Sequence, residues 1–541
     1  MKLKLIIVLS LVLYSQLALS QFNLFVNGAT TDQLNVLIPS GEDSRYLVIK
    51  DRDSITIDSL LIESCSSGCI FTIEELNHAT IYLLQLYQGQ DIQDERWAMT
   101  SSTSSGMVEV YFTTSIDTTV SNGFSPVATE GAILEDAIIT AIEQANFSID
   151  VMLYNVNRRP IINALSDAHN RGVKIRYLTS DNTNNIALSN PTPDFPILIG
   201  NLGSGLMHNK VFVIDTEDAD RALVITGATN MTTGQIFTDH NHMLFIQDQS
   251  LARAYEKEVD EMWGSRQAQP NPSLSRFGSA KLDDTPHEIY IHGVLYELYF
   301  SPSDNTTFKI VNTLNTAQVD CYFALLLFTR SNLASSIINL HNRGIDVKGL
   351  MNNTFENGSQ YSTLQSNGVF VLHYTNGPML HHKYCIIDEN GPPENAKLIT
   401  GSHNWSNNAE NRNDENTLII HDADLVNIFF QEFQARWCEQ FAGDDCRLVT
   451  SVEDVANISL DYKVHFDKSS SSLYVFPELA TSDKHTMQLF DVHGRMIYAK
   501  SFYFSGGETP HISSTLNLKS GIYFLNLTNQ SSRKVVSFTV N

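Results

Sequence analysis

Long apolar runs and basic residues are both scarce in this sequence. Beyond the first twenty residues no segment reaches about 18 uninterrupted apolar residues, the length that a membrane-spanning helix requires. The chain has 35 Lys and Arg against 60 Asp and Glu, a formal net charge of −25. Such an acidic chain repels polyanions at long range, which weighs against non-specific nucleic-acid binding. A basic cleft inside an acidic shell stays compatible with it.

Low-complexity tracts are absent as well. With 42% hydrophobic, 10% aromatic and 18% charged residues, the composition is typical of a globular protein. A chain of 541 residues exceeds what one hydrophobic core organises. We therefore expect about two to four domains.

The amino terminus has the layout of a secretory signal peptide. A positive start (Lys2, Lys4) precedes an apolar run over residues 5–13, and Ala18-Leu19-Ser20, with a small residue on each side of Leu19, offers a cleavage site before Gln21. The run is too short for a comfortable membrane span. We predict that residues 1–20 are removed and that the mature protein is soluble and exported; a retained anchor is the alternative.

Cysteines are few, and their spacing favours disulfides over a metal site. Cys65 and Cys69 lie four residues apart, and Cys438 and Cys446 lie eight apart, which suits two short local disulfides in an oxidising compartment. A metal site would need further Cys or His nearby in sequence, and none is evident. The two cysteines in apolar, strand-like runs are predicted to be buried thiols: Cys321 and Cys385.

The middle of the chain is a duplication. Helices are predicted over residues 134–145 and 306–316, each followed by an apolar strand, at 149–153 and 320–328. This alternation is typical of an α/β unit, and pseudo-twofold symmetry would bring equivalent loops together at a shared interface. The recurring segments are Val110-Tyr-Phe-Thr113 with Leu298-Tyr-Phe-Ser301, Ala168-His-Asn-Arg-Gly-Val-Lys174 with Leu340-His-Asn-Arg-Gly-Ile-Asp346, Met207-His-Asn-Lys210 with Leu380-His-His-Lys383, and Thr226-Gly-Ala-Thr-Asn230 with Thr400-Gly-Ser-His-Asn404. The last three pairs are offset by 172, 173 and 174 residues (168 to 340, 207 to 380, 226 to 400).

Two β-patterned regions flank the duplication. Residues from about 22 to 105 read as short strands separated by turns, which predicts a small β-domain, and the polar stretch 99–106 reads as a linker. Residues from about 460 to 541 are rich in Ser and Thr, patterned as strands, and free of a helix-length apolar stripe. They predict a separate C-terminal β-domain.

Each copy of the repeat carries a His-x-Lys pair on an apolar strand, followed by Asp and then by Gly-x-x-Asn. In a strand, residues two apart face the same side, so His208 and Lys210 share a face, as do His381 and Lys383. Four basic groups at a twofold interface suit a phosphodiester: the lysines neutralise its oxygens, one imidazole attacks phosphorus and the other protonates the leaving oxygen. This division needs no metal. Solvated polar residues on edge strands would not explain the duplication.

The paired motifs resemble the HKD motifs of the phospholipase D superfamily over about residues 106–445. The resemblance implies an α/β fold, namely a duplicated α-β-α sandwich with pseudo-twofold symmetry flanked by N- and C-terminal β-domains, and a reaction through a phosphohistidine without cofactor or metal. Its two aspartates usually support the fold more than they touch substrate. The implied catalytic residues are His208, Lys210, Asp215, Asn230, His381, Lys383, Asp388, Asn404 and Glu415. The implied substrate-binding residues are Lys210, Lys383, Asn230, Asn404 and Ser402, the last of which has Ala228 as its counterpart.

The copies differ beyond the asparagine, where the family carries an acid that orients the histidine of the opposite half. Glu415 occupies this place in the second copy, and we align His240 with it in the first. If the pairing is crossed, Glu415 orients His208 as in a catalytic triad. We therefore predict that His208 is the nucleophile and His381 the general acid.

The tail resembles the C-terminal sorting domain of the type IX secretion system, on Asp491-Val-His-Gly-Arg495, Gly521-Ile-Tyr-Phe524 and residues 534–538. This implies a Bacteroidetes-type bacterium and a protein that is secreted or held at the outer-membrane surface. An ordinary carbohydrate- or surface-binding β-module is the alternative. The expected domains are 1–20 (signal peptide), 21–105 (N-terminal β-domain), 106–266 (half 1), 267–292 (connector), 293–446 (half 2) and 460–541 (sorting domain).

Three functions fit these features. The first is a secreted phospholipase D-like phosphodiesterase that hydrolyses phospholipids to phosphatidic acid and a head-group alcohol, with phospholipid membranes or another phosphodiester and the type IX machinery as partners, and a monomeric state. The second is a secreted, metal-independent endonuclease. The third is a non-catalytic surface-binding relic, against which the complete His, Lys and Asn sets argue. A lipid-joining transferase is disfavoured because an exported chain lies far from lipid synthesis.

Overall fold

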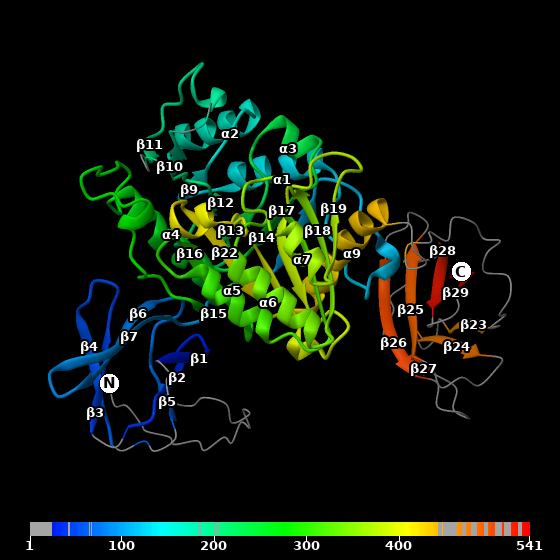
Figure 1. Ribbon diagram of the computed structural model, residues 1–541, viewed down its shortest axis with the longest axis horizontal. Coiled ribbons are helices and arrows are strands. Elements are labelled where there is room, and N and C mark those ends of the chain that lie inside the picture. Colours follow the sequence, from blue (N-terminus) through cyan, green and yellow to red (C-terminus); the bar gives the residue numbers. More distant parts are fainter. Residues whose placement is uncertain are drawn as a thin grey trace. The chain divides into compact units, whose positions relative to one another are not determined.

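The computed structural model (Figure 1) describes residues 24–441 and residue 446, together with the strands of a C-terminal domain between 462 and 540. The predicted signal peptide lies outside the described residues. Two compact units make up the chain, residues 1–120 with 126–441 and residues 121–125 with 442–541. Within the described part, no helix is both long and apolar enough to cross a membrane. Positions left out of the first range are 42–43, 64, 66–67, 182, 184, 201–202 and 204.

The amino-terminal β-domain consists of two small sheets around a shared apolar core. Their strand orders are β1-β2-β5 and β4-β3-β6-β7. Every second side chain of β2 and β3 is buried, and Val36, Leu47 and Leu84 meet in the core. The predicted β-domain is confirmed. Its strands are β1 (Phe25–Ala29), β2 (Leu34–Ile38), β3 (Arg45–Lys50), β4 (Thr56–Ile62), β5 (Cys69–Ile73), β6 (Ile81–Gln88) and β7 (Asp91–Met99).

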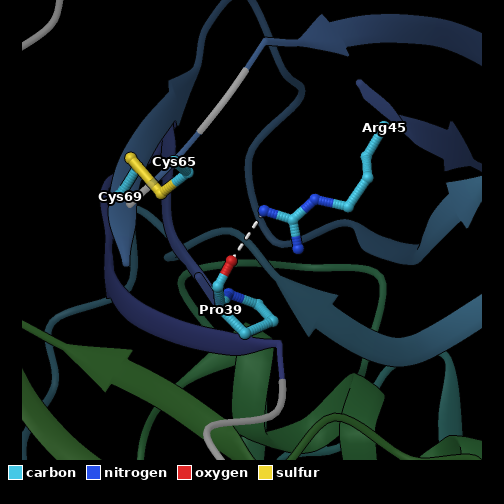
Figure 2. Close-up of a disulfide and its surroundings, with 4 residues drawn as sticks. All are labelled: Pro39, Arg45, Cys65 and Cys69. Carbon is cyan, nitrogen blue, oxygen red and sulfur yellow. Dashed lines mark hydrogen bonds between the residues drawn. A yellow bond between two sulfur atoms is a disulfide. The ribbon is translucent and has the colours of Figure 1, made fainter. Parts of the chain in front are cut away.

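A disulfide between Cys65 and Cys69 lies in this domain, at the start of β5 (Figure 2). The buried Arg45 donates from its guanidinium to the carbonyl oxygen of Pro39, at 2.7 Å. The states predicted for the other four cysteines are also confirmed: Cys438 and Cys446 are disulfide-bonded, and Cys321 and Cys385 are free and buried.

The first half of the duplication is a seven-stranded sheet of order β11-β10-β9-β12-β13-β14-β8. Strand β9 lies inside the sheet, parallel to β10 and antiparallel to the central strand β12. Helices α1 and α2 bring Leu134 and Leu165 into one core with the strands, and α4 packs against β9, β10, β12 and β13. The elements are β8 (Val108–Phe112), α1 (Gly131–Gln144), β9 (Ser148–Leu153), α2 (Arg159–Asn170), β10 (Lys174–Ser180), β11 (Ile197–Gly200), β12 (Lys210–Ile214), β13 (Leu223–Gly227), α3 (Thr233–Phe237), β14 (His242–Ile246) and α4 (Gln249–Trp263).

The second half repeats this arrangement in an eight-stranded sheet of order β15-β16-β22-β21-β20-β17-β18-β19, where β15 is the additional strand. The duplicated α/β fold predicted from the sequence is confirmed. The elements are β15 (Glu288–Ile291), β16 (Val294–Ser301), α5 (Thr306–Asn315), β17 (Asp320–Leu327), α6 (Ser331–Asn342), β18 (Asp346–Asn353), α7 (Tyr361–Ser366), β19 (Phe370–His373), β20 (Lys383–Ile387), β21 (Lys397–Gly401), α8 (Asn407–Asn411), β22 (Glu415–Ile420) and α9 (Ala423–Gln440).

The two halves exchange backbone hydrogen bonds at two equivalent places. The N–H of His208 donates to the carbonyl oxygen of Asp414 at 2.9 Å, and the N–H of His381 donates to that of His240 at 3.0 Å. Each bond joins the segment before β12 or β20 to the start of a strand in the other half. Because both His-x-Lys motifs begin at these crossings, the fold brings them to one interface.

The second unit is described by its strands, which form a four-stranded sheet β26-β25-β28-β29 and a three-stranded sheet β23-β24-β27. This confirms a C-terminal β-domain. The strands are β23 (Tyr462–Asp467), β24 (Ser472–Pro477), β25 (Lys484–Asp491), β26 (Met496–Tyr503), β27 (His511–Ile512), β28 (Gly521–Thr528) and β29 (Arg533–Val540).

Candidate active site

The two His-x-Lys motifs stand at the starts of equivalent strands. Lys210 opens β12 opposite Leu153, and Lys383 opens β20 opposite Leu325. Both lysines and both preceding histidines, His208 and His381, are buried. Buried cationic groups are costly unless an opposite charge compensates them. Their convergence therefore indicates an anion-binding site.

Glu415, the first residue of β22 in the second half, reaches across to the first half. Its Oε2 lies 2.6 Å from Nδ1 of His208, and its Oε1 accepts a hydrogen bond from Asn413 Nδ2 at 2.9 Å. Because a carboxylate accepts, Nδ1 of His208 carries the proton and Nε2 presents its lone pair. The crossed contact expected between Glu415 and His208 is thus present.

In the other half the acceptor is an amide, supplied by Asn241. Its Oδ1 lies 3.0 Å from Nδ1 of His381, while its Nδ2 donates to the carbonyl oxygen of Gln235 at 3.2 Å. The second bond fixes the amide so that the oxygen faces the imidazole. His381 therefore also carries its proton on Nδ1 and presents Nε2, but without a carboxylate behind it.

The alignment of His240 with Glu415 is wrong by one residue. Glu415 lies opposite Ser301 in the sheet, and its structural counterpart Asn241 exchanges hydrogen bonds with Thr113, the counterpart of Ser301. The offset of 174 residues between Asn230 and Asn404 leads from position 415 to 241, so a constant register would have found it. The prediction instead matched Asp239 with Asp414, the residues that precede His240 and Glu415, and this match hid the register.

The side chain of His240 serves a different contact. Its Nδ1 lies 2.7 Å from Thr114 Oγ1 and its Nε2 lies 2.9 Å from the hydroxyl of Tyr374. Burial and the charge of Arg436 lower the pKa of His240 to about 3. His240 contributes to His381 only through its backbone carbonyl.

The two lysines differ in their surroundings. Each Nζ donates to the carbonyl oxygen of the histidine two residues before it, at 2.6 Å for Lys383. Lys383 Nζ also lies 3.0 Å from Nδ1 and 3.3 Å from Nε2 of His381. Lys210 Nζ instead lies 5.2 Å from the ring centre of Tyr154.

Burial is the largest influence on protonation in the site. It lowers the pKa of His208 to about 4 despite the nearby Glu415, and together with Lys383 and Lys210 it lowers the pKa of His381 well below its usual value. Burial also lowers the pKa of Lys210 to about 7 and, with Lys210, that of Lys383. Burial would raise the pKa of Glu415, but His208 and Lys210 hold it at about 2. A phosphate anion here would raise the pKa of all four basic groups.

Asn230 and Asn404 follow β13 and β21 at the same edge of their sheets. Both are buried, and neither Oδ1 has a hydrogen-bond partner within the described chain. Buried polar atoms without a partner are uncommon. The observation fits the predicted contacts with substrate, which stay a prediction.

The two aspartates of the motifs do not meet the histidines. Asp215 accepts hydrogen bonds from the N–H groups of residues 146–148 at the start of β9, and Asp388 accepts them from residues 318–320 at the start of β17. Both lie at the far ends of β12 and β20 from the lysines. These contacts are structural, and a catalytic role of the two aspartates stays an untested prediction.

The side chain of Ser402 likewise makes a hydrogen bond within the protein. Its Oγ accepts from the N–H of Asn416 at 3.0 Å, and the side chain is fully buried. This contact joins β21 to β22, and the substrate contact predicted for Ser402 stays a prediction.

One group in the described chain has the spacing of a metal site: Asp283, His287 and Asp304. His287 Nε2 lies 2.8 Å from Asp283 Oδ1, and its Nδ1 lies 2.8 Å from the carbonyl oxygen of Leu298. The described contacts of these residues include neither His-x-Lys motif. This group could not be recognised in the sequence, because two strands separate Asp304 from His287.

Family models match both the duplicated region and the C-terminal region of the chain. The model of the "Cardiolipin synthase, PLD-like domain" family matches residues 138–263 and 310–437. The model of the "Secretion system C-terminal sorting domain" matches residues 469–541. The first pair covers the two halves of the duplication, and the second covers most of the C-terminal β-domain.

Curated relatives match a single stretch of this chain, whose length is about that of one half of the duplication. The mitochondrial cardiolipin hydrolase of Mus musculus is 32% identical over 139 residues, which is 25% of this chain and 60% of the relative. The phospholipase D of Rickettsia bellii (strain RML369-C) is 30% identical over 139 residues, 25% of this chain and 66% of the relative. The chain thus spans less than two thirds of either relative.

Among solved structures, the phosphatidylserine synthase of Haemophilus influenzae Rd KW20 is similar over 62% of this chain and 86% of that chain, with 12% identity and a TM-score of 0.43. The assignment rests on the two matched domains and the residues within them. Both carry the His-x-Lys, Asp and Asn of the motif at equivalent places. The chain therefore carries two PLD-like domains and a secretion-system sorting domain.

Proposed function

We propose that this protein is a secreted phospholipase D-type phosphodiesterase, which hydrolyses phospholipids to phosphatidic acid and a head-group alcohol. One observation carries the proposal. Two histidines from opposite halves have Nδ1 held by an acceptor of the other half, and each is followed two residues later by a buried lysine. This arrangement provides a nucleophile, an acid and charge neutralisation for one phosphodiester.

In the first step the Nε2 lone pair of His208 attacks phosphorus, and the bond from phosphorus to the head-group oxygen breaks. Protonated His381 gives its Nε2 proton to that oxygen, so the alcohol leaves neutral. Lys210 and Lys383 offset the charge on the non-bridging oxygens. The substrate anion itself favours the protonated form of His381, whose pKa is low in the buried site.

In the second step neutral His381 accepts a proton from water at Nε2 while the water oxygen attacks phosphorus. The bond between phosphorus and His208 breaks, and its electron pair returns to Nε2. The products are phosphatidic acid and the starting enzyme. An alcohol in place of water would give transfer instead of hydrolysis.

The neighbours of the histidines support this division. Attack places positive charge on the His208 ring, which Glu415 stabilises. Proton donation removes positive charge from His381, where Asn241 offers no carboxylate to retain the proton and Lys383 lies beside the ring. The residue roles remain a proposal that rests on these contacts.

Two facts favour a lipid over a nucleic acid as substrate. Similar proteins bear the names cardiolipin hydrolase and phospholipase D. The net charge of −25 opposes long-range attraction of a polyanion. Secretion is supported by the sorting domain, which implies export through the type IX system to the cell surface or the medium.

The test incubates the mature protein with phosphatidylcholine vesicles and, separately, with single- and double-stranded DNA, with EDTA present. Choline release that His208→Ala abolishes is the expected result. DNA cleavage without lipid turnover would overturn the lipid assignment and leave a nuclease. The absence of both lipid turnover and DNA cleavage would favour a non-catalytic binding protein. Loss in EDTA that Zn²⁺, Mg²⁺ or Ca²⁺ restores would contradict the metal-free reaction.

A further inference from the structure

One position near the carboxyl ends of the equivalent strands β9 and β17 differs between the two halves. Tyr154 follows β9 and Leu326 occupies the equivalent place in β17. The backbones are the same there: the N–H of Tyr154 donates to the carbonyl oxygen of Asn209 at 3.0 Å, and that of Leu326 donates to His382 at 2.9 Å. The difference therefore lies in the side chain alone.

The ring of Tyr154 adjoins both members of the first motif. Its centre lies 4.9 Å from the centre of the His208 ring and 5.2 Å from Lys210 Nζ. An ammonium at this distance is attracted to the face of an aromatic ring, most strongly where water is excluded. The phenol hydroxyl makes no hydrogen bond to a described residue. The contacts of Tyr154 with His208 and Lys210 are therefore made by its ring and not by its hydroxyl.

The second motif shows the arrangement without such a ring. Beside Leu326, the ammonium of Lys383 lies 3.0 and 3.3 Å from the two ring nitrogens of His381. In the first motif the described contacts of Lys210 include the carbonyl oxygen of His208 but neither ring nitrogen. Because Nδ1 of His381 carries the ring proton, the lone pair that faces the ammonium of Lys383 is that of Nε2, at 3.3 Å, and a lone pair that accepts a hydrogen bond from lysine is not available to attack phosphorus.

We propose that Tyr154 is a positioning residue that draws Lys210 away from the His208 imidazole and so makes the first half the nucleophilic half. The inference rests on the phosphohistidine of the proposed function and goes beyond it, because it names the side chain that breaks the symmetry. Leu326 leaves Lys383 against His381, which keeps that ring acidic. Glu415 and Tyr154 act on His208 from opposite halves.

The test uses bis(p-nitrophenyl) phosphate with the full chain, a denaturing alkaline quench, and peptide mapping of the phosphorylated histidine. Tyr154→Leu copies the second half and should lower kcat about tenfold while the label spreads from His208 to His381. Tyr154→Phe keeps the ring and should stay within about threefold of the parent with the label on His208. Leu326→Val is the matched control and should leave the distribution unchanged.

The outcomes separate the two proposals. No label on either histidine of the parent protein would overturn the proposed function. Label on His208 in the parent and an unchanged distribution in Tyr154→Leu would overturn only the role of Tyr154. Equal losses in Tyr154→Phe and Tyr154→Leu would assign the effect to the hydroxyl and likewise contradict the proposal. Thermal unfolding of each variant confirms that a lost label does not reflect a lost fold.

Discussion

The two halves of the duplicated core place the same motif on the same backbone but surround it differently. His208 has the carboxylate of Glu415 at 2.6 Å from Nδ1, whereas His381 has the amide oxygen of Asn241 at 3.0 Å. Lys383 Nζ lies 3.0 Å from a ring nitrogen of His381, whereas Lys210 Nζ lies beside the ring of Tyr154. The duplication thus sets the geometry of the site, and a few unmatched side chains set the role of each half.

Each surrounding suits the change in charge expected at its histidine. A ring that attacks phosphorus becomes positive, and a carboxylate held by a second residue, Asn413, stabilises that state. A ring that donates a proton becomes neutral, and a nearby ammonium favours this outcome while an amide only orients the ring. The comparison predicts that exchanging neighbours changes the halves unequally.

The largest effect is expected from removing each histidine in turn. With bis(p-nitrophenyl) phosphate, whose leaving group needs no proton, His208→Ala should lose at least about 10³-fold in turnover and form no adduct. His381→Ala should still release one equivalent of p-nitrophenol and accumulate an adduct on His208. A burst from His208→Ala instead of His381→Ala would reverse the assignment.

The next effect concerns the two acceptors. Glu415→Gln should lower kcat at least about 10²-fold, because His208 loses its charged partner and can adopt the wrong tautomer. Asn241→Asp adds the missing carboxylate and should cost less than about tenfold, while raising the pKa of His381. In a plot of kcat against pH, the basic limb of the Asn241→Asp variant should therefore lie at higher pH than that of the parent. Equal losses in the two variants would mean that the halves are equivalent.

The pH profile follows from the groups that must be charged or neutral. His208 must be neutral to attack, and its pKa of about 4 sets the acid limb of kcat/KM. Lys210 must be charged, and its pKa of about 7 places the basic limb no higher than about pH 7, while the low pKa of His381, which must be protonated, moves this limb to lower pH. kcat/KM should therefore be highest between about pH 4 and about pH 7. A maximum well above pH 8 would be inconsistent with these charge states.

The smallest effect on activity is expected where the halves are alike. Asp215→Asn and Asp388→Asn each weaken bonds to backbone N–H groups of three residues, so each should lower the free energy of unfolding by about 2–4 kcal/mol. Activity per folded molecule should stay within about threefold of the parent. Denaturant unfolding alongside kinetics measures both. A large kinetic loss in a fully folded variant would place the aspartates in the catalytic set.

Much of the core was predictable because its signals are local or repeated. Apolar strands after amphipathic helices predicted the α/β halves, and two His-x-Lys pairs in register predicted His208, Lys210, His381 and Lys383 at one interface. Glu415 was found through the expected crossing of the halves. The helices, strands and His-x-Lys pairs need only spacing along the chain, whereas Glu415 came from the acid that the resembled family carries past the asparagine.

Contacts that depend on register or side-chain direction were not predictable in this way. Asn241 was missed because a one-residue shift in alignment moves every side chain of a strand to the other face. The occupation of Ser402 by the N–H of Asn416 requires knowing which strand lies next to β21. Tyr154 carries no motif, and its importance becomes visible only from the position of its ring beside both His208 and Lys210.

The central claim is that the two halves have different tasks, and one measurement addresses it most directly. The parent protein is mixed with phosphatidylcholine vesicles, quenched within one turnover in denaturing alkali, and mapped for the phosphorylated histidine by mass spectrometry. The account predicts the phosphatidyl group on the peptide that contains His208. Label on the peptide that contains His381, or equal label on both, would contradict it.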